Sequence, residues 1–282
     1  MNEMNKDTTP LADETLGNGS SAHGHNRRAW DALVQRRQRF TRPAADEDFA
    51  DPLALVDPLG WLGDVRGKEL LCLAAGGGRQ SALYAAAGAI VTVVDISRQM
   101  LRLDREVAAE RGLAVFTIEA SMDDLSCLCA GRFELVVHPV STCYVPDVRA
   151  VYREVARVTA AGGIYISQHK QPASLQAQAY PSASGYELTE PYYRRGPLPP
   201  VIGSPHREEG TAEFLHRWEE LIGGLCRAGF VVEDLIEPQH ARRGAARGTF
   251  AHRSQYVAPY VRIKARRTGG ASGAPRRVIV PE

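Results

Sequence analysis

The chain has 282 residues, of which 44% are hydrophobic and 24% are charged, and its formal net charge is +1. This composition is typical of a globular protein with one large domain or two small ones. The near-neutral balance argues against binding of nucleic acid or an anionic membrane through overall charge. No apolar run approaches the roughly 20 residues that a membrane span requires.

The first 25 residues are polar and contain no apolar signal core, so we expect a disordered tail and a cytoplasmic protein. The five cysteines are odd in number and scattered, which is typical of reduced thiols. Cys127 and Cys129 have no second pair of ligands at the spacing of a zinc site. We therefore expect no metal.

An amphipathic helix is expected from Asn26 to about Phe40, and with the connector up to residue 66 it forms an N-terminal cap. From Lys68 onward, short apolar strands alternate with helices. This alternation predicts a doubly wound, mostly parallel sheet with its ligand site at the carboxyl ends of the strands. The expected strands are Glu69–Leu73, Ala89–Asp95, Leu113–Ile118, Phe133–Val137 and Ile164–Ser167, and the expected helices are Arg79–Ala87, a helix from the Ser97 cap to Arg111, and a helix after the Asp147 cap.

Residues 172–210 break this alternation with many prolines and glycines and four tyrosines, which predicts a folded lid. A helix around Trp218, a strand Phe230–Ile236 and a last strand Tyr256–Ala265 are expected to follow. The Gly-, Ser- and Arg-rich residues 268–282 are expected to form a second disordered tail. The folded domain is therefore expected to span residues 26–267.

Three glycines, Gly76 to Gly78, directly follow the first strand. They remove every Cβ at a point where a cofactor could approach the backbone. Asp95 ends the second strand, where a carboxylate can accept hydrogen bonds from a ribose diol, although it could also cap the next helix. A dinucleotide-type pattern would place Ala74 and Arg79 in glycine positions, which is a poor match to an NAD site.

These segments resemble class I S-adenosylmethionine-dependent methyltransferases, in particular their type 11-like, small-molecule branch. In that family an acid-x-Gly-x-Gly-x-Gly turn surrounds the methionine part of the cofactor, and the acid after the second strand binds the ribose. A loop after the third strand binds the adenine. The resemblance covers roughly residues 26–267 and is carried by Leu70–Gly78, Val94–Leu101, Ala120–Leu125, Phe133–Val137, Glu154–Gly163, Arg227–Phe230 and Tyr260–Arg266.

The resemblance implies a seven-stranded Rossmann-like α/β sheet whose last strand is antiparallel, with S-adenosylmethionine as cofactor and S-adenosylhomocysteine as product. The cofactor-binding residues that it implies are Ala74, Ala75, Gly76, Gly78, Asp95, Ile96, Met100, Ser121, Met122, Asp123 and His138. The chain departs from the family at Cys72, where the acid is expected, and at Ala74, where the first glycine is expected. A cofactor-binding protein without catalysis therefore remains an alternative.

Methyl transfer needs an acceptor aligned with the methyl group and, for a weak nucleophile, a base. The candidate bases are His138, His169 and His216, and the candidate walls of the acceptor pocket are Trp30, Tyr144, Tyr192 and Tyr193. We expect methylation of an oxygen or nitrogen of a small molecule by a monomer or homodimer. An NAD(P)-linked oxidoreductase remains an alternative, as does methylation of a macromolecule, for which the only basic cluster is Arg242–Arg247.

Overall fold

A computed structural model describes residues 19–269. Its core is a seven-stranded sheet of order β3-β2-β1-β4-β5-β7-β6, in which β7 runs antiparallel to both of its neighbours. The other pairings are parallel. This confirms the predicted doubly wound sheet. The strands are β1 (Glu69–Leu73), β2 (Ile90–Asp95), β3 (Val115–Glu119), β4 (Phe133–His138), β5 (Thr159–Lys170), β6 (Phe230–Ile236) and β7 (Tyr260–Arg267).

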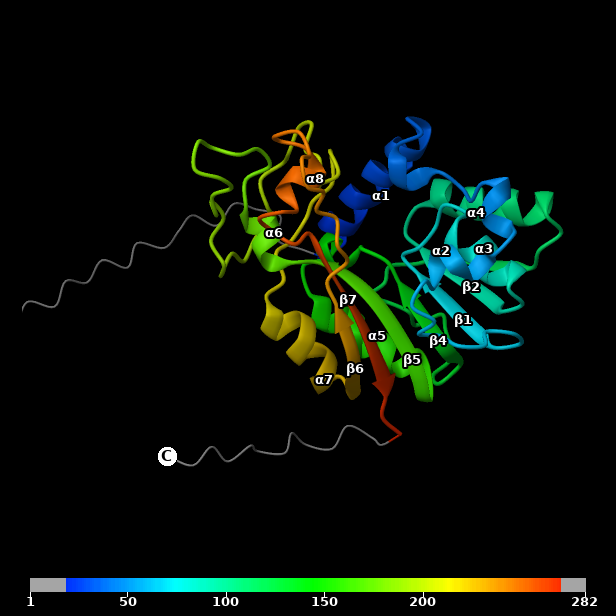
Figure 1. The fold of residues 1–282 in the computed structure, drawn as a ribbon. Coiled ribbons are helices and arrows are strands. Elements are labelled where there is room, and N and C mark those ends of the chain that lie inside the picture. The colour runs from blue at the N-terminus through cyan, green and yellow to red at the C-terminus, as the bar shows by residue number, and fades with distance from the viewer. Residues whose placement is uncertain (1–18, 270–282) are drawn as a thin grey trace, which may run out of the picture.

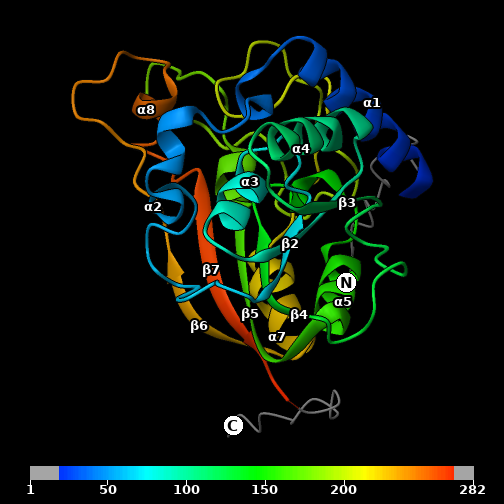
Figure 2. The ribbon, with the colours of Figure 1, turned by 90° about the vertical axis from the view of Figure 1, so that its right-hand side faces the viewer.

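Helices cover both faces of the sheet (Figures 1 and 2). One face packs against α5 (Val148–Val158) and α7 (Gly224–Arg227), and the other packs against α2 (Pro52–Val56), α3 (Gln80–Ala86) and α4 (Arg98–Glu110). Along β1 the side chains alternate between these two cores, as the pleat of a strand requires. Because both faces are buried, the central strands are apolar on both sides.

Helix α1 (Gly19–Gln35) lies across one end of the sheet, close to α4 and to the turn η3 (Thr142–Tyr144). Asn26 in α1 donates hydrogen bonds to the carbonyl oxygens of Tyr144 and Ala212, and its own side-chain oxygen accepts from the Ala212 N–H. Helices α6 (Pro172–Gln176) and α8 (Phe250–Arg253) gather at this same end (Figure 1).

The structure corrects several predicted boundaries. Helix α1 begins at Gly19 rather than Asn26, so part of the predicted N-terminal tail is helical. Residues 1–18 and 270–282 of the two predicted tails lie outside the described residues. Strand β5 begins at Thr159 rather than Ile164, because residues 159–163 also belong to the strand, beside an irregular pairing with β4. Strand β7 begins at Tyr260 rather than Tyr256, because Tyr256 lies in the turn that follows α8, where its N–H donates to the Arg253 carbonyl oxygen.

The predicted lid, residues 172–210, is mostly irregular. It contains α6 and an isolated bridge between Ala177 and Leu188. The helix expected around Trp218 begins as the π-helical η4 (Glu219–Gly223) and continues into α7. The connector before β1 contains two further short turns, η1 (Arg39–Thr41) and η2 (Asp46–Phe49).

Candidate functional site

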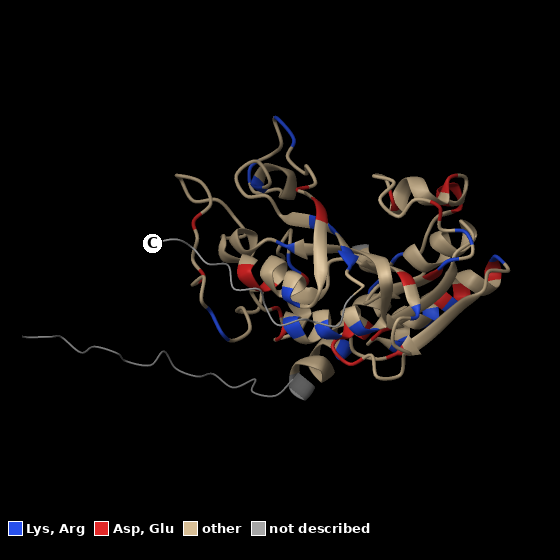
Figure 3. Cartoon of the chain, turned by 90° about the horizontal axis from the view of Figure 1, so that it is seen from below, with Lys and Arg blue, Asp and Glu red and all other residues tan. Residues whose placement is uncertain are grey.

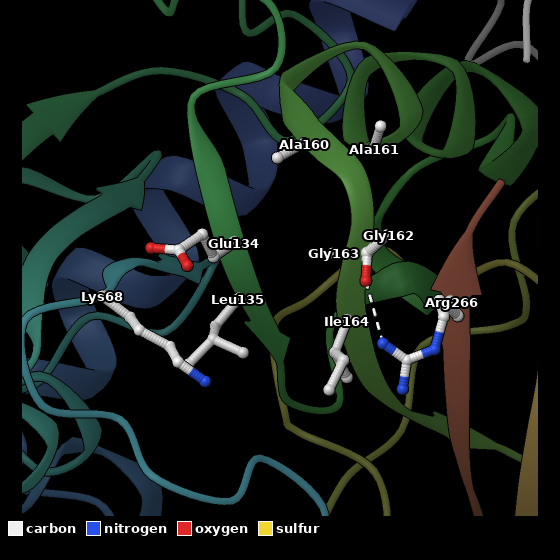
Figure 4. A pocket seen from close by; sticks show the side chains of 9 residues that line it. All are labelled: Lys68, Glu134, Leu135, Ala160, Ala161, Gly162, Gly163, Ile164 and Arg266. Carbon is white, nitrogen blue, oxygen red and sulfur yellow. Dashed lines mark hydrogen bonds between the residues drawn. The ribbon is translucent and has the colours of Figure 1, made fainter. Parts of the chain in front are cut away.

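A hollow of about 200 Å³ lies between Lys68, Glu134 and Arg266, as Figure 4 shows. Lys68 precedes β1 and Glu134 lies at the start of β4, so the hollow is at the amino-terminal ends of the parallel strands. Ligand sites of doubly wound sheets form at the opposite edge, outside the carboxyl ends. We therefore build the candidate site from the residues that follow β1, β2, β3 and β4.

The three glycines after β1 form the glycine turn. The Gly76 N–H donates to Asp95 Oδ2 at 3.0 Å. The N–H groups of Gly77 and Gly78 donate to the two carboxylate oxygens of Asp104, each at 2.9 Å. A pyrophosphate is bound by free backbone N–H groups. Because these three are already committed to carboxylates, the turn suits the cationic end of a cofactor better than a phosphate.

The glycine turn lies directly against α4. A Cβ on Gly76 would be 2.7 Å from Met100 Cβ, and a Cβ on Gly78 would be 2.9 Å from the Leu103 carbonyl oxygen. Both distances are too short for any side chain. Glycine is therefore required here for the close approach of turn and helix.

Asp95 is 8% exposed at the carboxyl end of β2. Burial raises its pKa to about 6, although hydrogen bonds from the backbone of Ser97 and Gly76 lower it, so the side chain is ionised at neutral pH. Each oxygen of a carboxylate accepts more than one hydrogen bond, which leaves capacity for a ribose diol. The cap of α4 is Ser97, whose hydroxyl accepts from the Met100 N–H at 3.1 Å.

The loop after β3 carries the residues predicted to bind adenine. The Ser121 hydroxyl donates to Asp123 Oδ1 at 2.5 Å, and His23 of α1 contacts Asp123 Oδ2 at 3.0 Å. Met122 is buried and Ile96 is half-buried. Helix α1 therefore contacts the predicted adenine loop directly, through a segment that was predicted to be a disordered tail.

His138 ends β4 and is 2% exposed. Its Nδ1 lies 2.7 Å from the hydroxyl of Tyr165 in β5. Its Nε2 is buried and has no hydrogen-bond partner within residues 19–269. Burial lowers its pKa to about 3, so the ring is neutral at physiological pH. A buried nitrogen without a partner is costly, which points to a group that binds there.

The other two candidate bases, His169 and His216, have hydrogen-bond partners that His138 lacks among the described residues. His169 contacts the Thr142 hydroxyl through Nδ1 and the Ser167 hydroxyl through Nε2, both at 2.8 Å. His216 donates from Nε2 to the carbonyl oxygens of Thr142 and Val145, at 2.9 and 3.0 Å. Burial lowers the pKa of both rings, to about 3 for His169. Of the three, His138 alone has a side-chain nitrogen among the unpartnered buried atoms of the described residues.

The four aromatic residues predicted to line an acceptor pocket fall into two pairs. Trp30 of α1 and Tyr144 of η3 meet edge to face, with ring centroids 5.6 Å apart. Tyr192 and Tyr193 contact each other at 5.3 Å, and Tyr193 is 75% exposed beside Arg217. The first pair joins α1 to η3, whereas the second lies at the surface of residues 172–210.

Sequence reasoning missed Asp104, although its pattern contained a signal. Asp104 is fully buried and lies four residues after Met100 and three before Val107, inside the buried stripe of α4. A carboxylate in an apolar stripe is unusual and requires hydrogen-bond donors. Those donors are the glycine-turn amides and the Ser81 hydroxyl.

A second missed group is the lid cluster, Lys170, Glu208 and Glu213 with Arg207 and Tyr144. Lys170 Nζ lies 2.6 Å from Glu208 and 2.5 Å from Glu213. The side chain of Lys170 is 3% exposed, that of Glu208 is 12% exposed and that of Glu213 is 0% exposed. Arg207 also pairs with Glu213, and the Tyr144 hydroxyl donates to Glu208 at 2.7 Å. Burial lowers the pKa of Lys170, but the two carboxylates more than offset this and raise it. No local pattern connects these residues.

Comparison with known proteins identifies the family. Residues 71–167 match a family model described as a methyltransferase domain. The protein called Uncharacterized methyltransferase YbaJ, from Bacillus subtilis, is 34% identical over 228 residues, which are 76% of this chain and 89% of that protein. The chain belongs to the class I methyltransferases.

Two further comparisons agree with this family. The ubiquinone biosynthesis O-methyltransferase of Bordetella pertussis is 31% identical over 118 residues, 40% of this methyltransferase and 49% of that enzyme. The structure of an S-adenosylmethionine-dependent methyltransferase from Mesorhizobium loti superposes with a TM-score of 0.60 at 22% identity, covering 78% of this chain and 100% of that one. Within residues 19–269 no helix is both long and apolar enough to cross a membrane.

S-adenosylmethionine is the methyl donor of this methyltransferase. The residues of the site fit it. The amides of the glycine turn are unavailable to a phosphate, and the ionised Asp95 keeps capacity for a ribose diol. At the same edge of the sheet, His138 has a buried nitrogen that finds no partner among residues 19–269.

Proposed function

We propose that this methyltransferase methylates an oxygen or nitrogen of a small molecule and that His138 Nε2 takes the proton of the acceptor. The observation that carries the proposal is the buried Nε2 at the carboxyl end of β4, one strand from the glycine turn, which has no partner in the part of the chain that the structure describes. Asp95, the turn and the loop with Ser121 and Asp123 hold the cofactor in this proposal.

When bound, S-adenosylmethionine supplies a methyl group on a positively charged sulfonium sulfur, and this sulfur would keep the electron pair of the S–C bond that breaks. His138 is neutral in the buried site. If Nδ1–H donates to the Tyr165 hydroxyl oxygen, the lone pair is on Nε2, which can then accept a proton. A hydroxyl oxygen that gains a methyl group while it still holds its proton is strongly acidic. Even a weakly basic imidazole therefore removes that proton, and the methyl ether is released neutral.

Two observations support a small acceptor. Trp30 and Tyr144 form an aromatic wall between α1 and η3, and the lid cluster holds the lid over the end of β5. In the cartoon of Figure 3, positions with Lys and Arg are interspersed with positions that carry Asp and Glu. The relative from Bordetella pertussis is an O-methyltransferase, which supports oxygen as the acceptor atom.

The acceptor class is tested with methyl-labelled S-adenosylmethionine. The enzyme is incubated separately with the small-molecule filtrate, the protein and the nucleic acid of the same cell extract. We expect label in the small-molecule fraction alone. Label in the protein or nucleic acid fraction instead would contradict the proposal.

The role of His138 is tested with His138→Gln once an acceptor is in hand. Because a base contributes typically 10²–10⁴-fold, we expect kcat to fall by about that factor while affinity for S-adenosylhomocysteine stays within about threefold. Tyr165→Phe, which removes the partner of Nδ1, should lower kcat less. An unchanged kcat in His138→Gln would show that the enzyme works by positioning alone.

A further inference from the structure

The glycine turn has a buried carboxylate behind it. Asp104 is 0% exposed and lies on α4, 27 residues beyond Gly77 in sequence. It accepts the N–H of Gly77 on Oδ2 and the N–H of Gly78 on Oδ1, and the Ser81 hydroxyl at the start of α3 also donates to Oδ1. One side chain thus joins the turn, α3 and α4.

We propose that Asp104 is a positioning residue for cofactor binding, which fixes the orientation of the glycine turn in place of the acid that is missing at Cys72. The inference concerns the cofactor alone and does not depend on the acceptor proposed above.

The peptide geometry gives the reason. The N–H and C=O groups of a trans peptide point in opposite directions, and the described residues contain no cis peptide bond. Because Asp104 holds the N–H groups of Gly77 and Gly78, the carbonyl oxygens of Gly76 and Gly77 point away from Asp104. Carbonyl oxygens accept hydrogen bonds from an ammonium group, such as that of the methionine part of the cofactor.

The location of Cys72 agrees with the proposal that Asp104 replaces the acid expected at position 72. Cys72 is fully buried in β1, and the negative charge of Asp104 contributes, after burial itself, to raising the pKa of its thiol. The two side chains therefore lie within electrostatic reach of each other. A carboxylate at position 72 would have to share this apolar space with Asp104. Two negative charges so close together in a buried site repel each other, so the space favours one carboxylate only.

The ionised form of Asp104 is the one that fits. All three of its contacts come from groups that donate, and a carboxylate can accept on both oxygens. Burial raises its pKa to about 6, against the hydrogen bonds from Ser81, Gly77 and Gly78, and the charge of Asp95 in β2 raises it further. As pH falls through 6, protonation of Asp104 removes an acceptor from the turn, and cofactor affinity should fall with it.

Calorimetry with S-adenosylhomocysteine on the full chain tests the proposal. Asp104→Asn keeps the shape but presents an NH2 group to one of the two turn amides. At pH 7.5 we expect affinity to fall by at least about tenfold, which is the order of one lost charge-assisted hydrogen bond. Below pH 6 the further loss of affinity should be shallower than in the wild type, because the group at position 104 no longer titrates.

Asp57→Asn is the matched control. Asp57 also accepts two successive backbone N–H groups, those of Trp61 and Leu62 at 3.0 and 2.9 Å, but in the connector before β1. We expect the affinity of Asp57→Asn for S-adenosylhomocysteine to stay within about twofold of that of the wild type. Wild-type affinity and an unchanged pH profile in Asp104→Asn would overturn the proposal.

Ser81→Ala is a milder variant that keeps Asp104 and removes one of its donors. Losing that donor raises the pKa of Asp104 further, so the midpoint of the pH dependence of binding should move to higher pH. The α-amino and α-carboxyl groups of the cofactor titrate outside pH 5–7 and do not obscure this shift. A midpoint identical to that of the wild type would refute the role of Asp104 even if Asp104→Asn failed to fold.

Discussion

The cofactor end and the lid end of this methyltransferase are held together in different ways. Around the glycine turn, carboxylates of Asp95 and Asp104 accept hydrogen bonds from backbone amides 19 to 27 residues away. In the lid, Lys170 contacts Glu208 and Glu213, which are 38 and 43 residues further along, and Asn26 contacts Ala212 across 186 residues. The first region is held by carboxylates that bind backbone amides within residues 76–104, whereas the second is assembled by contacts across longer stretches of the chain.

The difference shows where each region is vulnerable. A backbone-based site tolerates change in most side chains but depends on its few carboxylates and glycines. A buried ionic cluster depends on every one of its side chains, because removing one charge leaves another buried charge without compensation. Substitutions in the lid cluster should therefore act on stability, and those at the cofactor end on affinity.

The largest expected effect is in the lid cluster. Lys170→Met removes the cation that Glu208 and Glu213 share and leaves both carboxylates buried with insufficient compensation. We expect a loss of about 3–5 kcal/mol in the free energy of unfolding, because broken buried ion pairs cost that much. Chemical denaturation measures the loss, and limited proteolysis should show earlier cleavage between residues 172 and 210.

Lys264→Met is the control for this prediction. Lys264 lies 3.5 Å from Glu233 in a more exposed pair on the β6–β7 hairpin. Such pairs contribute about 0–1 kcal/mol, so the unfolding transition should shift little. Equal shifts in the two variants would mean that the lid cluster does not hold the lid.

An intermediate effect is expected at the cofactor end. Asp95→Ala removes the acceptor of the Gly76 N–H and the predicted partner of the ribose diol. We expect at least about tenfold weaker binding of S-adenosylhomocysteine, a loss of about 1.4 kcal/mol or more, measured by calorimetry. Ser97→Ala removes the cap of α4 and should cost about 1 kcal/mol of stability with little change in affinity. Unchanged affinity in Asp95→Ala would reduce Asp95 to a structural residue.

The smallest expected effect is at Ala74, which has φ +46° in the left-handed region. This conformation costs a residue with a Cβ roughly 1–2 kcal/mol. Replacement by glycine removes this cost, but it also increases the conformational entropy of the unfolded chain, which lowers stability by about 0.4–1 kcal/mol. Ala74→Gly should therefore stabilise the protein by about 0.5–1 kcal/mol in chemical denaturation. Ala85→Gly within α3 should destabilise it by a similar amount. A loss of stability in Ala74→Gly would show that the alanine side chain contributes packing that outweighs the strain.

The regular elements around the cofactor could be predicted closely from sequence. The bounds of β1 and β6 are those expected, and Ser97 and Asp147 cap α4 and α5 as expected. Apolar periodicity and short-range capping determine these features, and both are local. Among the boundary errors are those at Gly19 and Thr159, where a helix and a strand extend beyond their sequence signals, and at Tyr260, where a strand begins later than expected.

The sequence by itself therefore determined the doubly wound sheet, the glycine turn, the acid at Asp95 and the methyltransferase family, because each depends on residues close together in the chain. Only the tertiary structure decided that Asp104 lies under the turn and that Lys170 is buried between two glutamates. It also decided that a nitrogen of His138 has no partner among the described residues. The physical reason is burial. The role of a buried polar group depends on the hydrogen-bond and ionic partners that folding places around it, and no spacing along the chain specifies those partners.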